Sequence, residues 1–199
     1  MATLMALPNS KYSDMTIMCE RQSWEVHAMI VCPKSNALEE VWENGETVRT
    51  APRIQLSYKL LSTFFYGGNY QESATDEKAK PPIRSVVFHA RVYDAAESLE
   101  APDLETLAAD KFERACECIW SGVEFVELAQ AIYHGSTLHG RSFFDDDSEL
   151  HGRFLKAAKA RAAELLCSKP VCAAFKHAIS LNADLHDLCV ELAEALADR

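Results

Sequence analysis

Residues 12–35, YSDMTIMCERQSWEVHAMIVCPKS, decide the fold of the first half of the chain. Apolar and polar residues alternate over residues 15–19 and again over residues 24–26, with a short polar break between the two runs. Two such runs of period two predict paired antiparallel strands. The apolar run at residues 27–31 stops at Cys32-Pro33, and a proline disfavours helix in the residue before it, so we expect only a brief helix there.

The rest of the first half contains two further apolar segments and then a polar one. Residues 53–56 (RIQL) predict a short strand, and the apolar and aromatic run at residues 59–66 ends at Gly67-Gly68, whose backbone freedom favours a stop or turn. Residues 71–82 (QESATDEKAKPP) are polar, charged and rich in proline at their end. Such a segment cannot bury enough apolar surface to offset its chain entropy, so we expect a mobile loop.

The second half has the apolar spacing of a series of helices. The pattern predicts helices over residues 83–97, from Pro102 to about residue 119, and after a capping box at residues 121–124. A long helix follows the acidic residues 145–147, another begins at Pro170, and Asn182 caps the last. The long helix has its expected apolar stripe at Leu150, Phe154, Ala158, Ala162 and Leu165. The sequence therefore predicts an α+β fold, a short β-sheet flanked by helices and followed by an all-helical tail.

Composition and charge exclude several classes of partner for this 199-residue chain. Lys and Arg number 20 and Asp and Glu number 30, so the formal net charge is −10. Nucleic acids and anionic membranes both attract clustered cations, so we expect neither partner. No apolar run approaches the roughly 18 residues of a membrane helix, and residues 1–10 lack the basic start of a signal peptide. The 7 Cys are an odd number and scattered, which indicates reduced thiols and hence the cytoplasm or the nucleus.

Five segments in order resemble the BTB/POZ domain family, in particular its fungal branch. They are residues 12–17 with 24–27 (YSDMTI and WEVH), 31–35 (VCPKS), 65–70 (FYGGNY), 89–96 (HARVYDAA), and 102–104 with 108–112 (PDL and AADKF). The resemblance implies an N-terminal tail at residues 1–11, a BTB/POZ-like domain at residues 12–118 and a C-terminal helical extension at residues 119–199. The implied function is protein–protein association without catalysis, by self-association as a homodimer or by binding a partner. The alternative is a substrate adaptor that binds a cullin in a ubiquitin ligase.

The sequence departs from the family pattern in three places. Members usually carry two aromatic residues soon after the position of Ser35, where this chain has Asn36-Ala37-Leu38. Residues 57–65 are shorter, by roughly two helical turns, than the family's turn and full helix together. That helix lies where cullin-binding members make contact, so the shortening weakens the cullin alternative. Only about a dozen residues precede Asp14, so the resemblance implies no strand-swapped dimer.

The resemblance and the hairpin together select the interaction residues that we would test: Asp14, Met15, Ile17, His27, Leu38 and Trp42. Asp14 matches an acidic position near the family's self-association surface, but a carboxylate before a strand can also be solvated or cap a turn. His27 matches the family's histidine, and we favour a packed side chain that hydrogen-bonds to the backbone. Trp42 is an interface anchor if it is exposed, although a core or half-buried place is favoured; Trp24 belongs to the core.

Catalytic and metal-binding patterns are weak, and we expect no enzyme activity, no cofactor and no metal. Cys116 and Cys118 precede His134 and His139, but a Cys-x-Cys pair on a helix points its side chains about 200° apart. The acidic run at residues 145–149 lacks the glycine of a calcium loop and suits a helix start. A small metal-dependent or thiol enzyme would need a convergent titratable cluster. The other thiols are predicted as small core residues: Cys19, Cys32, Cys167, Cys172 and Cys189.

Overall fold

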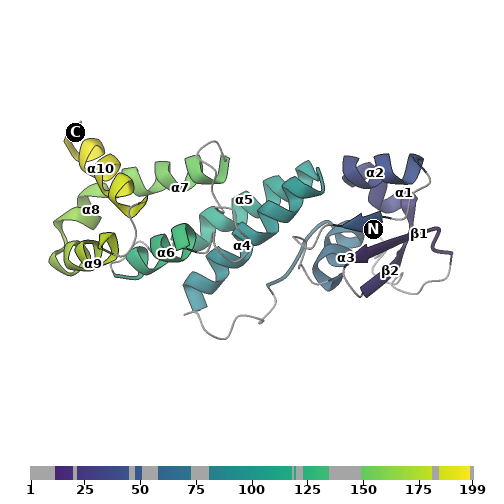
Figure 1. Cartoon of the computed structure of the whole chain (residues 1–199), viewed down its shortest axis with the longest axis horizontal. Coiled ribbons are helices and arrows are strands. Elements are labelled where there is room, and N and C mark those ends of the chain that lie inside the picture. Colours follow the sequence, from purple (N-terminus) through teal and green to yellow (C-terminus); the bar gives the residue numbers. More distant parts are fainter. Residues whose placement is uncertain are drawn as a thin grey trace. The chain divides into compact units, whose positions relative to one another are not determined.

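The computed structural model describes residues 12–19, 22–44, 48–50, 58–72, 81–117, 119, 123–134, 149–180 and 184–197. These residues belong to two compact units, whose elements are labelled in Figure 1. Unit 1 comprises Met1–Thr75 and Arg91–Ala108, and unit 2 comprises Asp76–Ala90 and Ala109–Arg199. The division falls inside the helices α4 (Pro81–Ser98) and α5 (Pro102–Glu117), whereas the resemblance implies a boundary after residue 118.

Unit 1 contains a three-stranded sheet in the order β2-β1-β3. Strands β1 (Met15–Cys19) and β2 (Gln22–Val26) pair antiparallel, with Ile17 opposite Trp24, so the predicted hairpin is confirmed. Strand β3 (Val48–Thr50) pairs parallel to β1 and was not predicted, because it is short and lacks an apolar alternation. The predicted strand at residues 53–56 lies outside the described residues. The α+β class is confirmed by this small sheet among helices.

Three short elements connect β2 to β3. The helix α1 (Ala28–Val31) has four residues and is followed by the 3-10 turn η2 (Cys32–Lys34), as the proline predicts. The helix α2 (Asn36–Glu43) comes next, and its N-cap is Ser35, whose hydroxyl accepts a hydrogen bond from the Leu38 N–H at 3.2 Å. A serine oxygen at this position satisfies one of the N–H groups that a helix start leaves without an intrahelical partner.

The helix α3 (Tyr58–Gly67) buries four large apolar side chains in unit 1: Leu60, Leu61, Phe64 and Phe65. Its C-terminal end is held by Lys34, whose Nζ donates to the Phe65 carbonyl at 2.6 Å and lies 5.5 Å from the centre of the Phe64 ring. A cation at this end complements the helix dipole. Gly68 follows with φ +71°, the left-handed conformation that commonly ends a helix, as Gly67-Gly68 predicts.

The helix α4 begins at Pro81, two residues before the predicted start at residue 83. Proline suits the first helical turn because no intrahelical bond needs its missing N–H. The predicted mobile loop at residues 71–82 therefore extends two residues too far, because residues 81 and 82 belong to α4. Residues 73–80 lie outside the described residues. The α4–α5 turn is tight: Glu100 has φ +48°, and the Ala101 N–H donates to the Ala96 carbonyl at 2.9 Å.

Unit 2 packs five more helices: α6 (Val123–His134), α7 (Glu149–Ala160), α8 (Ala162–Cys167), α9 (Lys169–Ile179) and α10 (Asp184–Ala197). The predicted long helix is divided at Arg161 into α7 and α8, yet its apolar stripe is buried throughout. The core of this unit contains Phe125, stacked on Phe154 at 5.7 Å between ring centres and edge-on to Phe175 at 6.0 Å.

The cysteines only partly follow the prediction of small core residues. Cys32 is buried as predicted, whereas Cys167 is exposed, which makes the prediction wrong at that position. Cys116, which was not part of that prediction, is also buried. Cys172 and Cys189 are half-buried, and burial is the first cause that raises the pKa of Cys189 to about 11. All described helices are too short or too polar to span a lipid bilayer.

Candidate interaction surface

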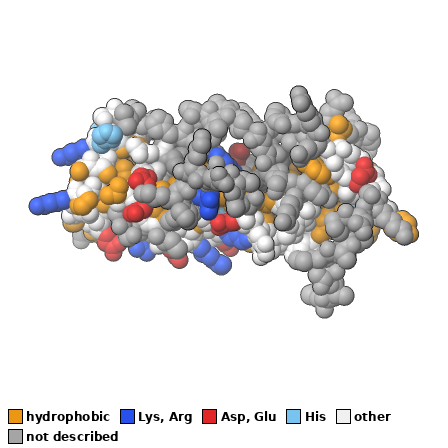
Figure 2. All heavy atoms as spheres, turned by 90° about the horizontal axis from the view of Figure 1, so that it is seen from below, with side chains coloured by type: hydrophobic (Ala, Val, Ile, Leu, Met, Phe, Trp, Pro, Cys, Tyr) orange, Lys and Arg blue, Asp and Glu red, His pale blue; other side chains and the backbone are white. Residues whose placement is uncertain are grey.

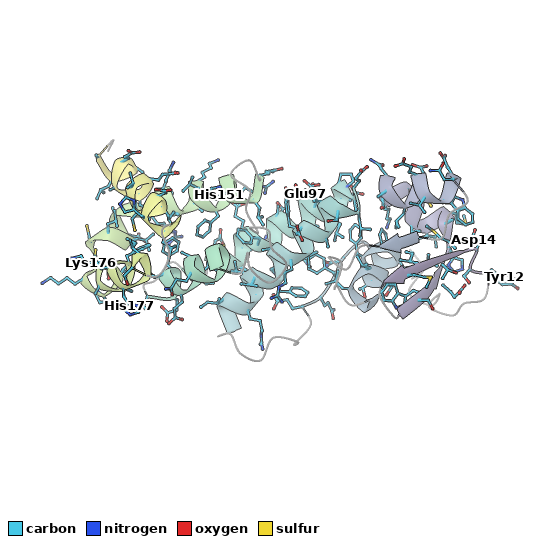
Figure 3. The ribbon with its side chains drawn as sticks, viewed as in Figure 1. Tyr12, Asp14, Glu97, His151, Lys176 and His177 are labelled. Atoms are coloured by element: carbon cyan, nitrogen blue, oxygen red, sulfur yellow. The ribbon has the colours of Figure 1, made fainter. Side chains whose placement is uncertain are left out.

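Asp14 connects the sheet to the first helix. Its Oδ1 accepts a hydrogen bond of 2.7 Å from the N–H of Ala28, the first residue of α1, and its own N–H donates to the Val26 carbonyl at 3.2 Å. Figure 3 labels Asp14 beside β1. Asp14 therefore caps the start of α1, which is one of the two roles that the sequence left open for it.

We expect the Asp14→Ala substitution to lower the free energy of unfolding by about 1 kcal/mol, because it removes the acceptor at the start of α1. Asp14→Asn keeps an oxygen acceptor in the same place and should cost only a few tenths of a kcal/mol. Urea denaturation followed by circular dichroism measures both. Equal losses in the two variants would contradict the capping role and assign the effect to the charge of Asp14.

Three of the predicted interaction residues lie in the interior of unit 1. Met15 and Ile17 on β1 and Leu38 on α2 are all buried. Strand alternation places Met15 and Ile17 on the same face of the sheet, and that face is covered. A partner cannot reach these side chains without rearranging the unit, so the structure corrects their assignment from surface to core.

His27 is packed, as favoured from the sequence, but its partner is a side chain. Its Nδ1 lies 2.8 Å from the Tyr66 hydroxyl, and its backbone N–H donates to the same oxygen at 3.2 Å. The hydroxyl can accept the backbone bond and donate its own proton to Nδ1. These contacts join the start of α1 to α3, so His27 has a structural role here and does not form part of an exposed surface.

Among the described residues of unit 1, three large apolar side chains are exposed: Tyr12, Met29 and Trp42. Met29 on α1 is 81% exposed and Trp42 on α2 is 41% exposed, and α1 packs against α2. Trp42 is therefore exposed, and the core or half-buried place that we favoured for it is wrong. Met29 could not be identified from the sequence, because a run of five residues is too short for helical spacing to mark its outer side.

Carboxylates border these two apolar side chains. Glu39 and Glu43 lie three residues before and one residue after Trp42 on the outer side of α2. The pKa of the buried Cys32 thiol is raised, first by burial and then by the negative charges of Glu39, Asp14 and Glu43. We call the exposed side chains Asp14, Met29, Glu39, Trp42 and Glu43 the α1–α2 surface.

Burial and nearby negative charges determine the protonation state of the Cys32 thiol. A raised pKa keeps the Cys32 thiol protonated at neutral pH, and a thiol is a far weaker nucleophile than a thiolate. In the described part of the chain, no three side chains of His, Cys, Asp and Glu lie close enough together to hold a metal ion. The side chains of Cys118, His134 and His139 lie outside what the structure describes. A scan of protein-family models and a search of curated proteins both find no match to this chain.

Proposed function

We propose that unit 1 is a protein–protein interaction module of the BTB/POZ type, without catalysis of its own, and that its partner binds the α1–α2 surface. The observation that carries the proposal is the exposure of Met29 next to a helix that also exposes Trp42. Large apolar side chains exposed together on a soluble domain are typical of interaction sites. Methionine adapts its shape to a partner, and tryptophan is among the residues that most often dominate binding energy.

The positions of the family-like segments support the same proposal. The first lies on the β1–β2 hairpin and the second spans η2 to the N-cap of α2. The third lies at the end of α3, and the last two lie in α4 and α5. The segments lie on successive elements in the same order as in the BTB/POZ family, which favours a similar topology.

The mechanism is the burial of an apolar centre within a charged rim. Covering Met29 and Trp42 removes apolar area from water, which stabilises a complex by roughly 25 cal/mol per Å². Asp14, Glu39 and Glu43 remain at the rim, where charges govern orientation and choice of partner more than affinity. The acidic rim therefore selects a partner that brings cations to its edge.

Self-association of the full chain is the direct test of this surface. We expect sedimentation velocity from about 1 to about 200 μM to show reversible association, and Met29→Glu or Trp42→Glu to weaken it at least tenfold, or about 1.4 kcal/mol. Each change places a charge where the apolar contact is buried. Val190→Glu is the matched control, because Val190 on α10 is 41% exposed, as Trp42 is.

Equal weakening by Val190→Glu would contradict the choice of surface and indicate a general effect of added charge. Unchanged association in both Met29→Glu and Trp42→Glu would also contradict the choice of surface. Circular dichroism spectra of all three variants must match that of the unmodified chain, so that a loss of association is not a loss of fold.

A second candidate function is adaptor binding to a cullin, and it would use α3. A helix of ten residues, Tyr58–Gly67, lies in the region where cullin-binding members of the family make contact, and it agrees with the expectation that the segment is too short for a turn and a full helix together. Its outer side chains include Ser62, Thr63 and Tyr66, which are partly exposed. Calorimetry with the N-terminal domain of a cullin from the same source tests this function. Absence of binding at about 100 μM, which corresponds to an affinity weaker than about −5.5 kcal/mol, would exclude it.

A further inference from the structure

The helix α9 in unit 2 is basic in an acidic chain. It contains Lys169, Lys176 and His177 and no Asp or Glu, although the formal net charge of the whole chain is −10. All three side chains are exposed, and none of them makes an ion pair with another residue that the structure describes. Figure 3 shows Lys176 extending away from α9. The two lysine charges of α9 have no ion-pair partner within the described part of unit 2.

The exposed side of α9 also has the shape of a contact surface. Lys169, Ala173 and Lys176 follow one another at spacings of four and three residues, so they lie on one face of the helix, and all three are exposed. The alanine between the two lysines leaves room for a larger side chain from a partner. Figure 2 shows apolar side chains interspersed with Lys and Arg over the α8–α10 part of the chain, at the left of the view.

The α1–α2 surface is complementary to this face in both charge and chemistry. Glu39 and Glu43 make no ion pair with any described residue, as is the case for the lysines of α9. Trp42 lies between these two carboxylates along α2, and a lysine ammonium binds the face of a tryptophan ring through its π electrons. A lysine flanked by carboxylates and placed on a tryptophan ring would satisfy both charges while Met29 packs beside it.

We propose that the face of α9 formed by Lys169, Ala173 and Lys176 in one copy of the chain docks on the α1–α2 surface of a second copy. This inference rests on the proposed function of unit 1 and names its partner. Each copy presents both faces, so the contact is head-to-tail, and it continues into a ring or an open chain of copies.

The overall negative charge does not prevent this contact at physiological ionic strength. The screening length at 0.15 M salt is about 8 Å, so charges that lie further apart than this interact only weakly. Repulsion between whole copies is therefore damped, while carboxylates and ammonium groups in direct contact still attract. Local complementarity between the two faces then determines how the copies associate.

Two charge reversals and their mixture test the contact by sedimentation velocity of the full chain. We expect Glu43→Lys and Lys176→Glu, each measured alone, to weaken association at least tenfold, because each replaces an attraction in the contact by repulsion between two charges of the same sign. An equimolar mixture of the two variants should regain association, because one variant supplies an acidic face to the basic α9 of the other. Lys156→Glu on α7 is the control with an identical charge change at another exposed lysine, and it should associate as the unmodified chain does.

The outcomes separate this inference from the proposed function. If Met29→Glu weakens association and Lys176→Glu does not, α9 is not the partner, and the α1–α2 surface binds a symmetric copy or another cationic protein. If neither substitution has an effect, the α1–α2 surface is wrong as well. A chain that stays monomeric over the whole concentration range overturns the head-to-tail contact outright, and so does a mixture of variants that does not regain association.

Discussion

Replacing Phe154 by alanine is expected to lower the free energy of unfolding by about 3–5 kcal/mol, a large fraction of the stability of a typical domain. Phe154 on α7 is buried, and its ring stacks on that of Phe125 on α6 at an interplanar angle of 12°. Phe125 in turn contacts Phe175 on α9. Alanine at this position leaves a cavity in the middle of three helices and removes the aromatic contact, and the two losses add.

Phe154→Leu is the control, because leucine keeps most of the buried volume and loses the ring stacking. We expect this variant to lose clearly less than the alanine variant. Urea denaturation followed by circular dichroism gives both values, and hydrogen exchange of the α6, α7 and α9 amides shows where protection is lost. A loss below about 1 kcal/mol in the alanine variant would mean that the stacked rings do not form the core of unit 2.

The helical part of this core could be predicted from the sequence because its apolar spacing is regular. All five positions of the predicted stripe from Leu150 to Leu165 are buried. The interruption at Arg161 could not be predicted, because the apolar spacing continues through it and no proline or glycine marks it. A change of backbone direction between two helices depends on how each packs on its neighbours, and α7 and α8 both pack against α10.

In unit 1, the apolar pattern of the sequence predicted some elements and not others. Alternation predicted both strands of the hairpin, but it was not used to decide which side faces the core, and Met15 and Ile17 are buried. It could not predict β3, because a strand of three residues paired in parallel depends on a distant partner more than on its own sequence. The resemblance then placed Met15 and Ile17 at an interface, although the alternation that predicts the strand also predicts burial.

The candidate surface was the least predictable part of the chain. Trp42 was identified, but a core or half-buried place was favoured for it, since a lone tryptophan in a polar segment is more often covered than exposed; it is 41% exposed. Helical spacing over α2 resolves this once the bounds of the helix are known: Leu38 points inward, whereas Glu39 and Glu43 lie on the outer side. Exposure of Met29 depends on a helix of only four residues, which is too short for its periodicity to be recognised.

Replacing Ser35 by alanine is expected to lower the free energy of unfolding by about 2–3 kcal/mol and to weaken association through the α1–α2 surface. Ser35 is buried, and its hydroxyl accepts from the Leu38 N–H and donates to the Leu99 carbonyl in the α4–α5 turn. The next residue repeats this link, since the Asn36 N–H donates to the Glu100 carbonyl at 3.1 Å. Alanine leaves the Leu99 carbonyl buried without this donor, and the desolvation of that carbonyl dominates the loss. The Leu38 N–H loses one of its two acceptors and keeps the Ser35 backbone carbonyl at 3.1 Å.

We expect Ser35→Ala to weaken association because α2 holds three residues of the α1–α2 surface. Glu39, Trp42 and Glu43 lie on this helix, so fraying of its first turn displaces the side chains that we propose as the contact, although none of them is altered. Ser98→Ala is the matched control, because the Ser98 hydroxyl donates to the Asp94 carbonyl on an exposed side of α4. Its effect should stay within about 0.5 kcal/mol and leave association unchanged. Equal losses in the two serine variants, or intact hydrogen-exchange protection of the Leu38 amide in Ser35→Ala, would show that Ser35 does not hold α2 in place.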